Sequence, residues 1–211
     1  VPDFLGLDLI YGPQFESAGG LVDVTDALQG LPLDKASPGH MAVATYEDRI
    51  YGVPLYADLS LLVWNKDLFR AAGLDPDKPP QTLDEIAEYA EKLTALGDDV
   101  HGYFFAGSCA GCNIFTVAPL MWAQGAKIEP AGPGDEAMTG DGIKRTLQWA
   151  RDLVNNGDTP PSARAENGEN FAKVFTSGKL GMMGHGNFII GELAKNNPDM
   201  DYGIACLPGA E

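Results

Sequence analysis

Two closely spaced cysteines are the residues whose spacing most directly suggests chemistry. Cys109 and Cys112 form a C-x-x-C pair in the sequence SCAGCN of residues 108–113. Such a pair can be a redox centre, half of a zinc site or a local disulfide clamp. A zinc site needs further ligands nearby, which the three widely separated histidines do not supply: His40, His101 and His185. We therefore expect no metal site, and redox chemistry, a structural bridge and reduced thiols remain open.

Glycines at a predicted strand end are the second motif with possible chemistry. Gly181, Gly184 and Gly186 have the spacing G-x-x-G-x-G. A nucleotide-binding P-loop also needs a Gly-Lys-Ser/Thr sequence, and Gly178-Lys179 is followed by leucine instead. We expect these glycines to let the backbone approach a ligand or a helix closely. The third cysteine, Cys206, is predicted to be a small buried apolar residue.

Composition excludes several classes of function. The 211 residues include 14 Lys and Arg against 30 Asp and Glu, which gives a formal net charge of −16. Binding to nucleic acid or to an anionic membrane surface requires clustered basic residues, so neither is expected. Hydrophobic residues make up 45%, as in globular proteins. Neither a G-x-S-x-G nucleophile motif nor a histidine in a triad-like setting is present, so no catalytic residue and no cofactor are predicted.

Strands and helices alternate along the predicted secondary structure. Short apolar runs predict strands or extended segments over residues 3–10, 50–56, 60–64, 103–106, 180–183 and 202–207. Capping residues and helical periodicity predict helices over residues 65–73, 82–97, 113–124, 141–156, 170–177 and 188–196, the third of them kinked by Pro119. This alternation favours an α/β fold with a largely parallel sheet and a crevice at the carboxyl ends of its strands.

Three stretches, taken in order, carry a resemblance to a known family. They are AGGLVDVT at 18–25, YGVPLYADLSLLVWNKDLF at 51–69 and FTSGKLGMMG at 175–184. Together they resemble family 1 of the extracellular solute-binding proteins of bacterial carbohydrate ABC transporters, the maltose-binding-protein-like group. The resemblance implies an α/β fold of the two-lobe periplasmic-binding-protein type II. Because the chain has about half the usual length, the first lobe would be incomplete.

The resemblance also implies where the lobes begin and end. Residues 1–104 would be part of the N-terminal α/β lobe, residues 105–205 the second α/β lobe, and residues 206–211 the start of the return hinge. The chain would cross between lobes near residues 103–107 and 205–209.

Sugar binding is the function that the resemblance implies, and it directs attention to aromatic and polar residues near strand ends. Sugars present apolar ring faces and hydroxyl rims, which suit aromatic rings, carboxylates and amides. Asp58 occupies the position of an acidic sugar ligand in the family, and Phe188 stands where the family commonly has tryptophan. The full set of expected ligand-binding residues is Asp8, Tyr11, Tyr56, Asp58, Asn113, Trp122, Asn187 and Phe188.

Several of these residues also have purely structural interpretations. Asp58 could be a solvated or helix-capping acid, and Asn187 could cap the following helix. Phe188 and Trp122 could be core residues. Asn113, together with a loop bridged by Cys109 and Cys112 as a structural disulfide, would form the rim contributed by the second lobe.

The leading interpretation is a non-enzymatic receptor that binds a mono- or oligosaccharide between two lobes and delivers it to the membrane permease of an ABC transporter. It would be extracytoplasmic, in the periplasm or lipid-anchored outside the membrane, and a monomer when intact. Two alternatives remain: a polyamine or cation receptor on the same scaffold, and a sugar-acting hydrolase with a carboxylate pair such as Asp8 and Asp58.

Overall fold

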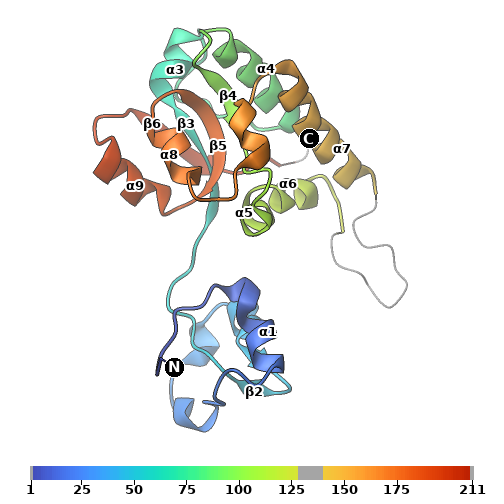
Figure 1. Cartoon of the computed structure of the whole chain (residues 1–211), viewed down its shortest axis with the longest axis vertical. Coiled ribbons are helices and arrows are strands. Elements are labelled where there is room, and N and C mark those ends of the chain that lie inside the picture. The colour runs from blue at the N-terminus through green and yellow to red at the C-terminus, as the bar shows by residue number, and fades with distance from the viewer. Residues whose placement is uncertain (1, 128–139, 210–211) are drawn as a thin grey trace. The chain divides into compact units, whose positions relative to one another are not determined.

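A computed structural model describes residues 2–127 and 140–209 of the chain. Its contacts divide the chain into two compact units, Val1–Ala57 and Asp58–Glu211 (Figure 1). This division differs from the expected boundary near residue 104. The reason is that strands on both sides of residue 104 hydrogen-bond within one sheet, so a boundary there would cut through the sheet of the second unit.

The first unit consists of short elements. They are η1 (Leu9–Tyr11), α1 (Gly12–Ser17), η2 (Asp26–Leu28), η3 (Leu33–Lys35), α2 (Pro38–Val43), β1 (Thr45–Tyr46) and β2 (Arg49–Ile50). β1 and β2 form an antiparallel hairpin whose turn residues Glu47 and Asp48 have φ of 48° and 61°. Positive φ at both turn residues matches the twist of a tight hairpin.

Two strand predictions in this unit fail wholly or in part. The strand expected over residues 3–10 is wrong: Leu9–Tyr11 is a 3-10 helix, and Phe4 is 96% exposed. No described strand pairs with this segment, and an apolar run without a partner strand gains no ladder hydrogen bonds. Of the segment 50–56, only Ile50 belongs to a strand.

The second unit is built on a four-stranded mixed sheet. Its strands are β3 (Ser60–Asn65), β4 (His101–Phe104), β5 (Leu180–Gly186) and β6 (Tyr202–Cys206), in the order β4-β5-β3-β6. β4 and β5 are parallel, whereas β3 is antiparallel to both of its neighbours. The prediction of a largely parallel sheet is therefore wrong at β3. Because β3 is reversed, its first residues lie at the carboxyl ends of β5 and β6.

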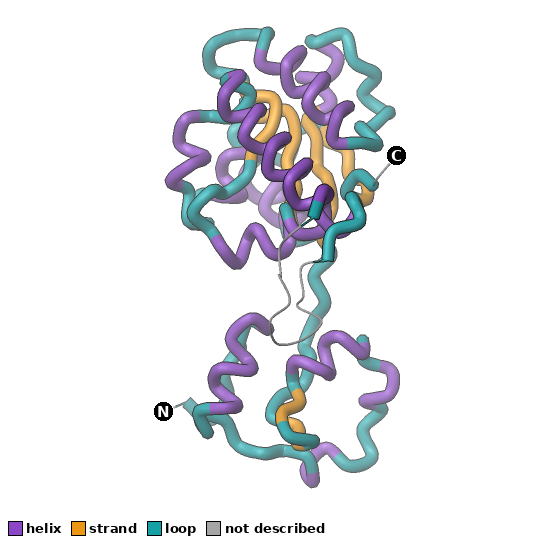
Figure 2. Tube along the Cα trace, turned by 90° about the vertical axis from the view of Figure 1, so that its right-hand side faces the viewer, coloured by secondary structure: helices purple, strands orange, loops and turns teal. Residues whose placement is uncertain are grey.

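Helices cover both faces of this sheet (Figure 2). They are α3 (Lys66–Ala71), α4 (Leu83–Thr94), α5 (Ala110–Thr116), α6 (Ala118–Ala123), α7 (Asp141–Asn156), η4 (Pro161–Ala165), α8 (Phe171–Thr176) and α9 (Ile189–Asn196). Leu62 and Trp64 of β3 pack in a cluster with residues of α3, α4 and α7. Leu61 and Val63, on the opposite face, pack with residues of α8 and α9. The fully apolar β3 is thus explained by burial on both faces.

Local sequence signals account for the ends of several helices. The Asn65 side chain caps α3 by accepting hydrogen bonds from two backbone amides, at 3.0 and 3.1 Å. Thr82 Oγ1 accepts from the Glu85 amide at 3.1 Å and caps α4, as predicted. Gly157, in the left-handed region, ends α7. The helix expected over 113–124 is divided at Val117 into α5 and α6, since Pro119 lacks the amide that would continue it.

The contact between α4 and β4 gives a stability prediction. Gly102 lies so close to Ala90 that a Cβ at this position would overlap the Ala90 backbone. We expect Gly102→Ala to lower the free energy of unfolding by about 1–3 kcal/mol or more, because backbone cannot move aside cheaply. Gly191→Ala is the matched control, since a Cβ there meets open space and alanine favours the helix by up to about 1 kcal/mol.

Urea unfolding of both variants measures the difference. Equal stability of Gly102→Ala and the unmodified protein would contradict the close approach of α4 and β4.

Candidate functional site

Asp58 and Asn187 meet where β3 begins and β5 ends. Ser60 pairs with Gly186 in the ladder, which brings the residues just outside the two strands together. The Asn187 amide donates to Asp58 Oδ1 at 3.0 Å and to the Leu59 carbonyl at 3.0 Å. The Asp58 side chain is thereby joined to the Asn187 main chain, 129 positions away in the sequence.

Gly186 lies directly between Asp58 and Phe188. A Cβ at Gly186 would overlap both Asp58 Oδ2 and the Phe188 ring, so these two side chains converge on the face that glycine leaves open. Phe188 is 56% exposed and Asp58 is also exposed, which contradicts the interpretation of Phe188 as a core residue. The Asp58 carboxylate and the Phe188 ring therefore border the same solvent-accessible place beside Gly186.

His185 lies beneath the surface here and contacts the Phe188 ring from the core side. It was not among the site residues expected from the sequence. Its imidazole is 0% exposed and stacks on Phe171 of α8, with ring centroids 4.7 Å apart and planes at 14°. Phe188 packs edge-on against the same imidazole at 4.6 Å. The signal available in the sequence was a histidine between two glycines directly before Asn187.

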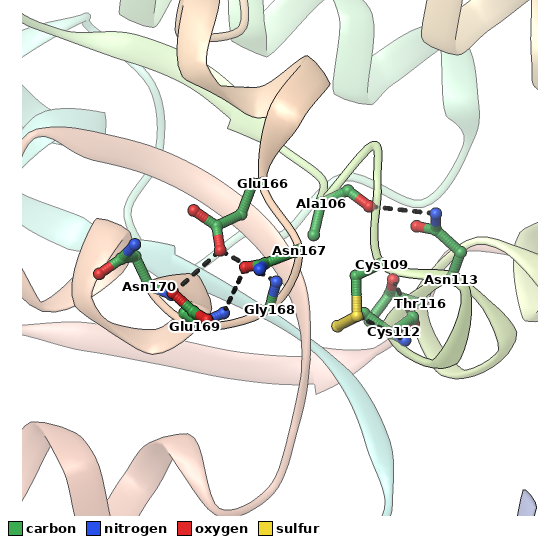
Figure 3. Close-up of a disulfide and its surroundings, with 10 residues drawn as sticks. All are labelled: Ala106, Cys109, Cys112, Asn113, Thr116, Glu166, Asn167, Gly168, Glu169 and Asn170. Atoms are coloured by element: carbon green, nitrogen blue, oxygen red, sulfur yellow. Dashed lines mark hydrogen bonds between the residues drawn. A yellow bond between two sulfur atoms is a disulfide. The ribbon is translucent and has the colours of Figure 1, made fainter.

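Cys109 and Cys112 are joined in a disulfide at the start of α5 (Figure 3). Cys109 Sγ accepts a hydrogen bond from the Cys112 amide at 3.1 Å and so caps this helix. Gly168, with φ of 105°, packs against both sulfur atoms. Glu166 Oε1 accepts from the amides of Gly168 and Asn170 at 2.9 and 3.0 Å, and these bonds, the one from Asn170 above all, lower the pKa of the Glu166 carboxyl.

The remaining expected residues of the second unit lie on α5 and α6. Asn113 Nδ2 donates to the Ala106 carbonyl at 3.1 Å, which holds this side chain to its own loop (Figure 3). Trp122 on α6 is 48% exposed, contrary to the interpretation as a core residue. Cys206 is exposed rather than buried, because it lies on the edge strand β6.

Three expected ligand residues belong to the first unit. The Asp8 carbonyl accepts from the Tyr11 amide at 3.0 Å, so these two residues share one turn. The Tyr11 and Tyr56 side chains are 49% and 84% exposed. The structure thus brings together Asp58, Asn187 and Phe188, and in the first unit Asp8 and Tyr11.

The described part of the chain holds neither a cluster of metal ligands nor a membrane-spanning helix. Within residues 2–127 and 140–209, no three His, Cys, Asp or Glu side chains come together to hold a metal ion. In the same part of the chain, no helix has the length and apolar character needed to cross a membrane.

Comparison with known families gives a match over residues 7–211 to the model of the bacterial extracellular solute-binding proteins. This chain belongs to that family. Membership confirms the predicted resemblance, and it favours a binding protein over a hydrolase, because the relatives are substrate-binding proteins of ABC importers.

Individual relatives agree with the family assignment. The glycerol-3-phosphate-binding periplasmic protein UgpB of Brucella abortus is 27% identical over 216 residues, covering 93% of this chain and 46% of its own length. A solute-binding protein of Thermotoga lettingae bound to α-D-tagatose has a TM-score of 0.85 at 25% identity, over 95% of this chain and 52% of the other.

Maltose-bound MalE3 of Thermotoga maritima has a TM-score of 0.80 at 25% identity, over 96% of this chain and 51% of the other. The expected solute-binding-protein fold is therefore confirmed, and the chain spans about half the length of these relatives.

The disulfide gives a prediction about local order. We expect Cys109→Ser/Cys112→Ser to speed hydrogen exchange at the amides of Gly168 and Asn170, because Gly168 packs on the two sulfurs. Global stability should fall by less than the roughly 3 kcal/mol given by a 15-residue loop, since this loop is much shorter.

Hydrogen exchange followed by mass spectrometry checks this, with α4 as the internal control. Unchanged exchange over residues 166–170 would contradict a role of the disulfide in holding this loop.

The buried His185 gives a second prediction. Burial lowers the pKa of this imidazole, so the unfolded chain takes up the proton first as the pH falls below the ordinary value of 6.5. The free energy of unfolding should therefore decrease on acidification through that range. In His185→Phe this contribution is absent, and the stability curve should be flatter as the pH falls below about 6.5. Parallel curves for the two proteins, measured by urea unfolding, would contradict it.

Proposed function

We propose that this chain carries a sugar-binding site of a solute-binding receptor that serves an ABC importer. The convergence of Asp58 and Phe188 on Gly186 is the observation that carries this proposal. Asp58, Asn187 and Phe188 form its contact set in the second unit. Sugar ligands in relatives of the same fold, tagatose and maltose, agree with this choice of ligand class.

The chemistry of the three residues suits a hydroxylated ring. The exposed Phe188 ring can stack on the apolar C–H face of a sugar, and its edge-on contact with His185 holds it in place. The Asp58 carboxylate can accept hydrogen bonds from sugar hydroxyls, because its Oδ2 faces the same place. Asn187 uses its main-chain amide to fix Asp58, which leaves its side-chain amide able to donate to a hydroxyl.

Charge at the site favours a neutral sugar over a phosphate ester. One relative is named for glycerol 3-phosphate, and anionic phosphates are bound by Arg, Lys or helix N-termini. Phe188 is the N-cap of α9, but the Asp58 carboxylate lies beside this helix N-terminus and already accepts from the Asn187 amide. The charged groups that act on His185, at the centre of this site, are Asp58 and Glu192, both acidic. A phosphate would be repelled by Asp58, whereas a hydroxyl donates to it.

The same groups bear on the cation-receptor and hydrolase alternatives. Two carboxylates facing one amine-sized pocket would favour a polyamine, but the Glu192 carboxylate accepts from Asn196 Nδ2 at 2.8 Å on its own helix. Of these two acids, Asp58 is the one whose carboxylate oxygen borders Gly186. Membership in the solute-binding family counts against the hydrolase, which would pair Asp8 with Asp58.

Further parts of the proposal concern the complete receptor. Asp8, Tyr11, Tyr56, Asn113 and Trp122 are proposed as additional sugar contacts. The partner would be a membrane permease, the location would be outside the cytoplasmic membrane, in the periplasm or with a lipid anchor, and the intact receptor would be a monomer. A disulfide-bonded C-x-x-C pair is compatible with such an oxidising location.

Calorimetric titration with tagatose, maltose, mannitol, glycerol 3-phosphate and spermidine tests the proposal. We expect heat of binding from a neutral sugar or polyol with no product formed. Asp58→Asn should weaken that binding about 10- to 100-fold, because a hydrogen bond to a charged group contributes about 1.5–3 kcal/mol. Phe188→Ala should weaken it as well, through loss of the stacking surface.

Asp84→Asn is the matched control, because Asp84 is an exposed acid that pairs with Arg145 on the helical surface. It should leave affinity unchanged. Selective binding of spermidine or of glycerol 3-phosphate would overturn the sugar assignment, and so would equal affinities for the Asp58→Asn variant and the unmodified protein.

A further inference from the structure

Three aromatic rings in contact lie beneath the proposed sugar site, and the middle ring, a histidine, is stacked on one neighbour and meets the other edge-on. The rings form a row in space: Phe171 from α8 contacts His185 from β5, and His185 contacts Phe188. The ring centroids are 4.7 and 4.6 Å apart, respectively. Phe171 is 8% exposed, His185 is 0% exposed and Phe188 is 56% exposed. The row of three rings therefore runs from the core to the solvent-accessible place beside Asp58. The position of Phe188 depends on its contact with the His185 ring.

A hydrogen bond of His185 defines the tautomer of its neutral ring. Nδ1 lies 3.0 Å from the carbonyl oxygen of Gly186, which can only accept, so Nδ1 carries a proton. In the neutral ring Nε2 then bears a lone pair, and among the described residues this buried atom has no hydrogen-bond partner. The bond to Gly186 also fixes the backbone on which Asp58 and Phe188 converge.

The surroundings of the imidazole oppose a positive charge. Burial disfavours the imidazolium and lowers the pKa of His185, although Asp58 and Glu192 of α9 act in the opposite sense. From α8 the contact is the uncharged Phe171 ring, and from β3 the ladder partner is Leu61. A second proton would create a buried N–H at Nε2 with no acceptor among the described residues.

We propose that His185 is a positioning residue whose neutral imidazole holds Phe188 and Gly186 in the geometry that receives the sugar, so that acidification weakens capture. The role in capture rests on the proposed function, whereas the coupling between His185 and Phe188 is a property of the protein alone. Protonation of His185 disturbs its packing against Phe171 and Phe188. Only the molecules with a neutral His185 ring are then competent to bind the sugar. One pH unit below the midpoint of His185, about one-tenth of the molecules retain it, and apparent affinity falls about tenfold.

The first test needs no ligand. Ring signals of Phe188 and imidazole signals of His185 are followed by NMR on the whole chain between pH 4.5 and 8, after assignment with Phe188→Leu and His185→Asn. We expect the Phe188 signals to shift with the midpoint of His185. A Phe188 titration that does not follow His185 would overturn the proposal.

Two variants separate positioning from simple packing. His185→Asn retains a donor toward Gly186 but neither titrates nor stacks, and His185→Phe retains a stacked ring without titration or donor. In each, the pH dependence of Phe188 should vanish. His40→Asn, a substitution in the first unit, is the control and should keep it. Persistence of the Phe188 shift in either folded His185 variant would overturn the proposal, and the measurement on the unmodified chain decides if neither variant folds.

The second test uses maltose, tagatose and mannitol as probes. For any of these that binds at pH 7.5, the apparent Kd should rise about tenfold one unit below the measured midpoint of His185, and His185→Phe should bind with no such pH dependence. An identical pH dependence in His185→Phe would contradict the coupling to capture. Absence of binding by every neutral probe, with the NMR coupling intact, would count against the sugar site and support the positioning role of His185.

Discussion

The antiparallel pairing of β3 with β5 places the beginning of one strand beside the end of the other, and the candidate site depends on this pairing. With Ser60 opposite Gly186, the residues just outside the ladder face one another, and Asp58 reaches the Asn187 amide. If β3 ran parallel to β5, Asp58 would lie at the opposite end of the strands, beside the start of β5. The same reversal sets the start of β3 beside the carboxyl end of β6, where Leu61 pairs with Cys206.

The site also requires a glycine at position 186, the last residue of β5. Gly186 is buried and bordered by the Asp58 carboxylate and the Phe188 ring, so any side chain here would fill the space in which they converge. The rings below extend this arrangement into the core, since Phe171 and Phe175 of α8 belong to the cluster that also contains Leu61. The candidate site is thus supported by the packing of α8 against the sheet.

Much of the second unit could be predicted from local sequence. The capped helices α3 and α4 and the amphipathic α7 follow from Asn65, Thr82 and the periodicity ending at Gly157, and the structure has them nearly as expected. Asp58, Asn187 and Phe188 could be nominated through a family resemblance. His185 was missed, because its place between two glycines before Asn187 is a weak cue and its stacking partner Phe171 comes from a separate helix.

The predictions that failed share a physical cause. Residues 3–10 have the composition of a strand, yet a strand exists only where a neighbour supplies its hydrogen bonds. The direction of β3 is likewise set by long-range pairing, which local propensity does not report. The sequence by itself determined helix ends, the apolar strands, the acidic surface and the family. Only the tertiary structure decided which strand ends meet, and hence which carboxylate lies beside the Phe188 ring and the buried His185, because Asp58 is 129 positions from the Asn187 amide that it contacts.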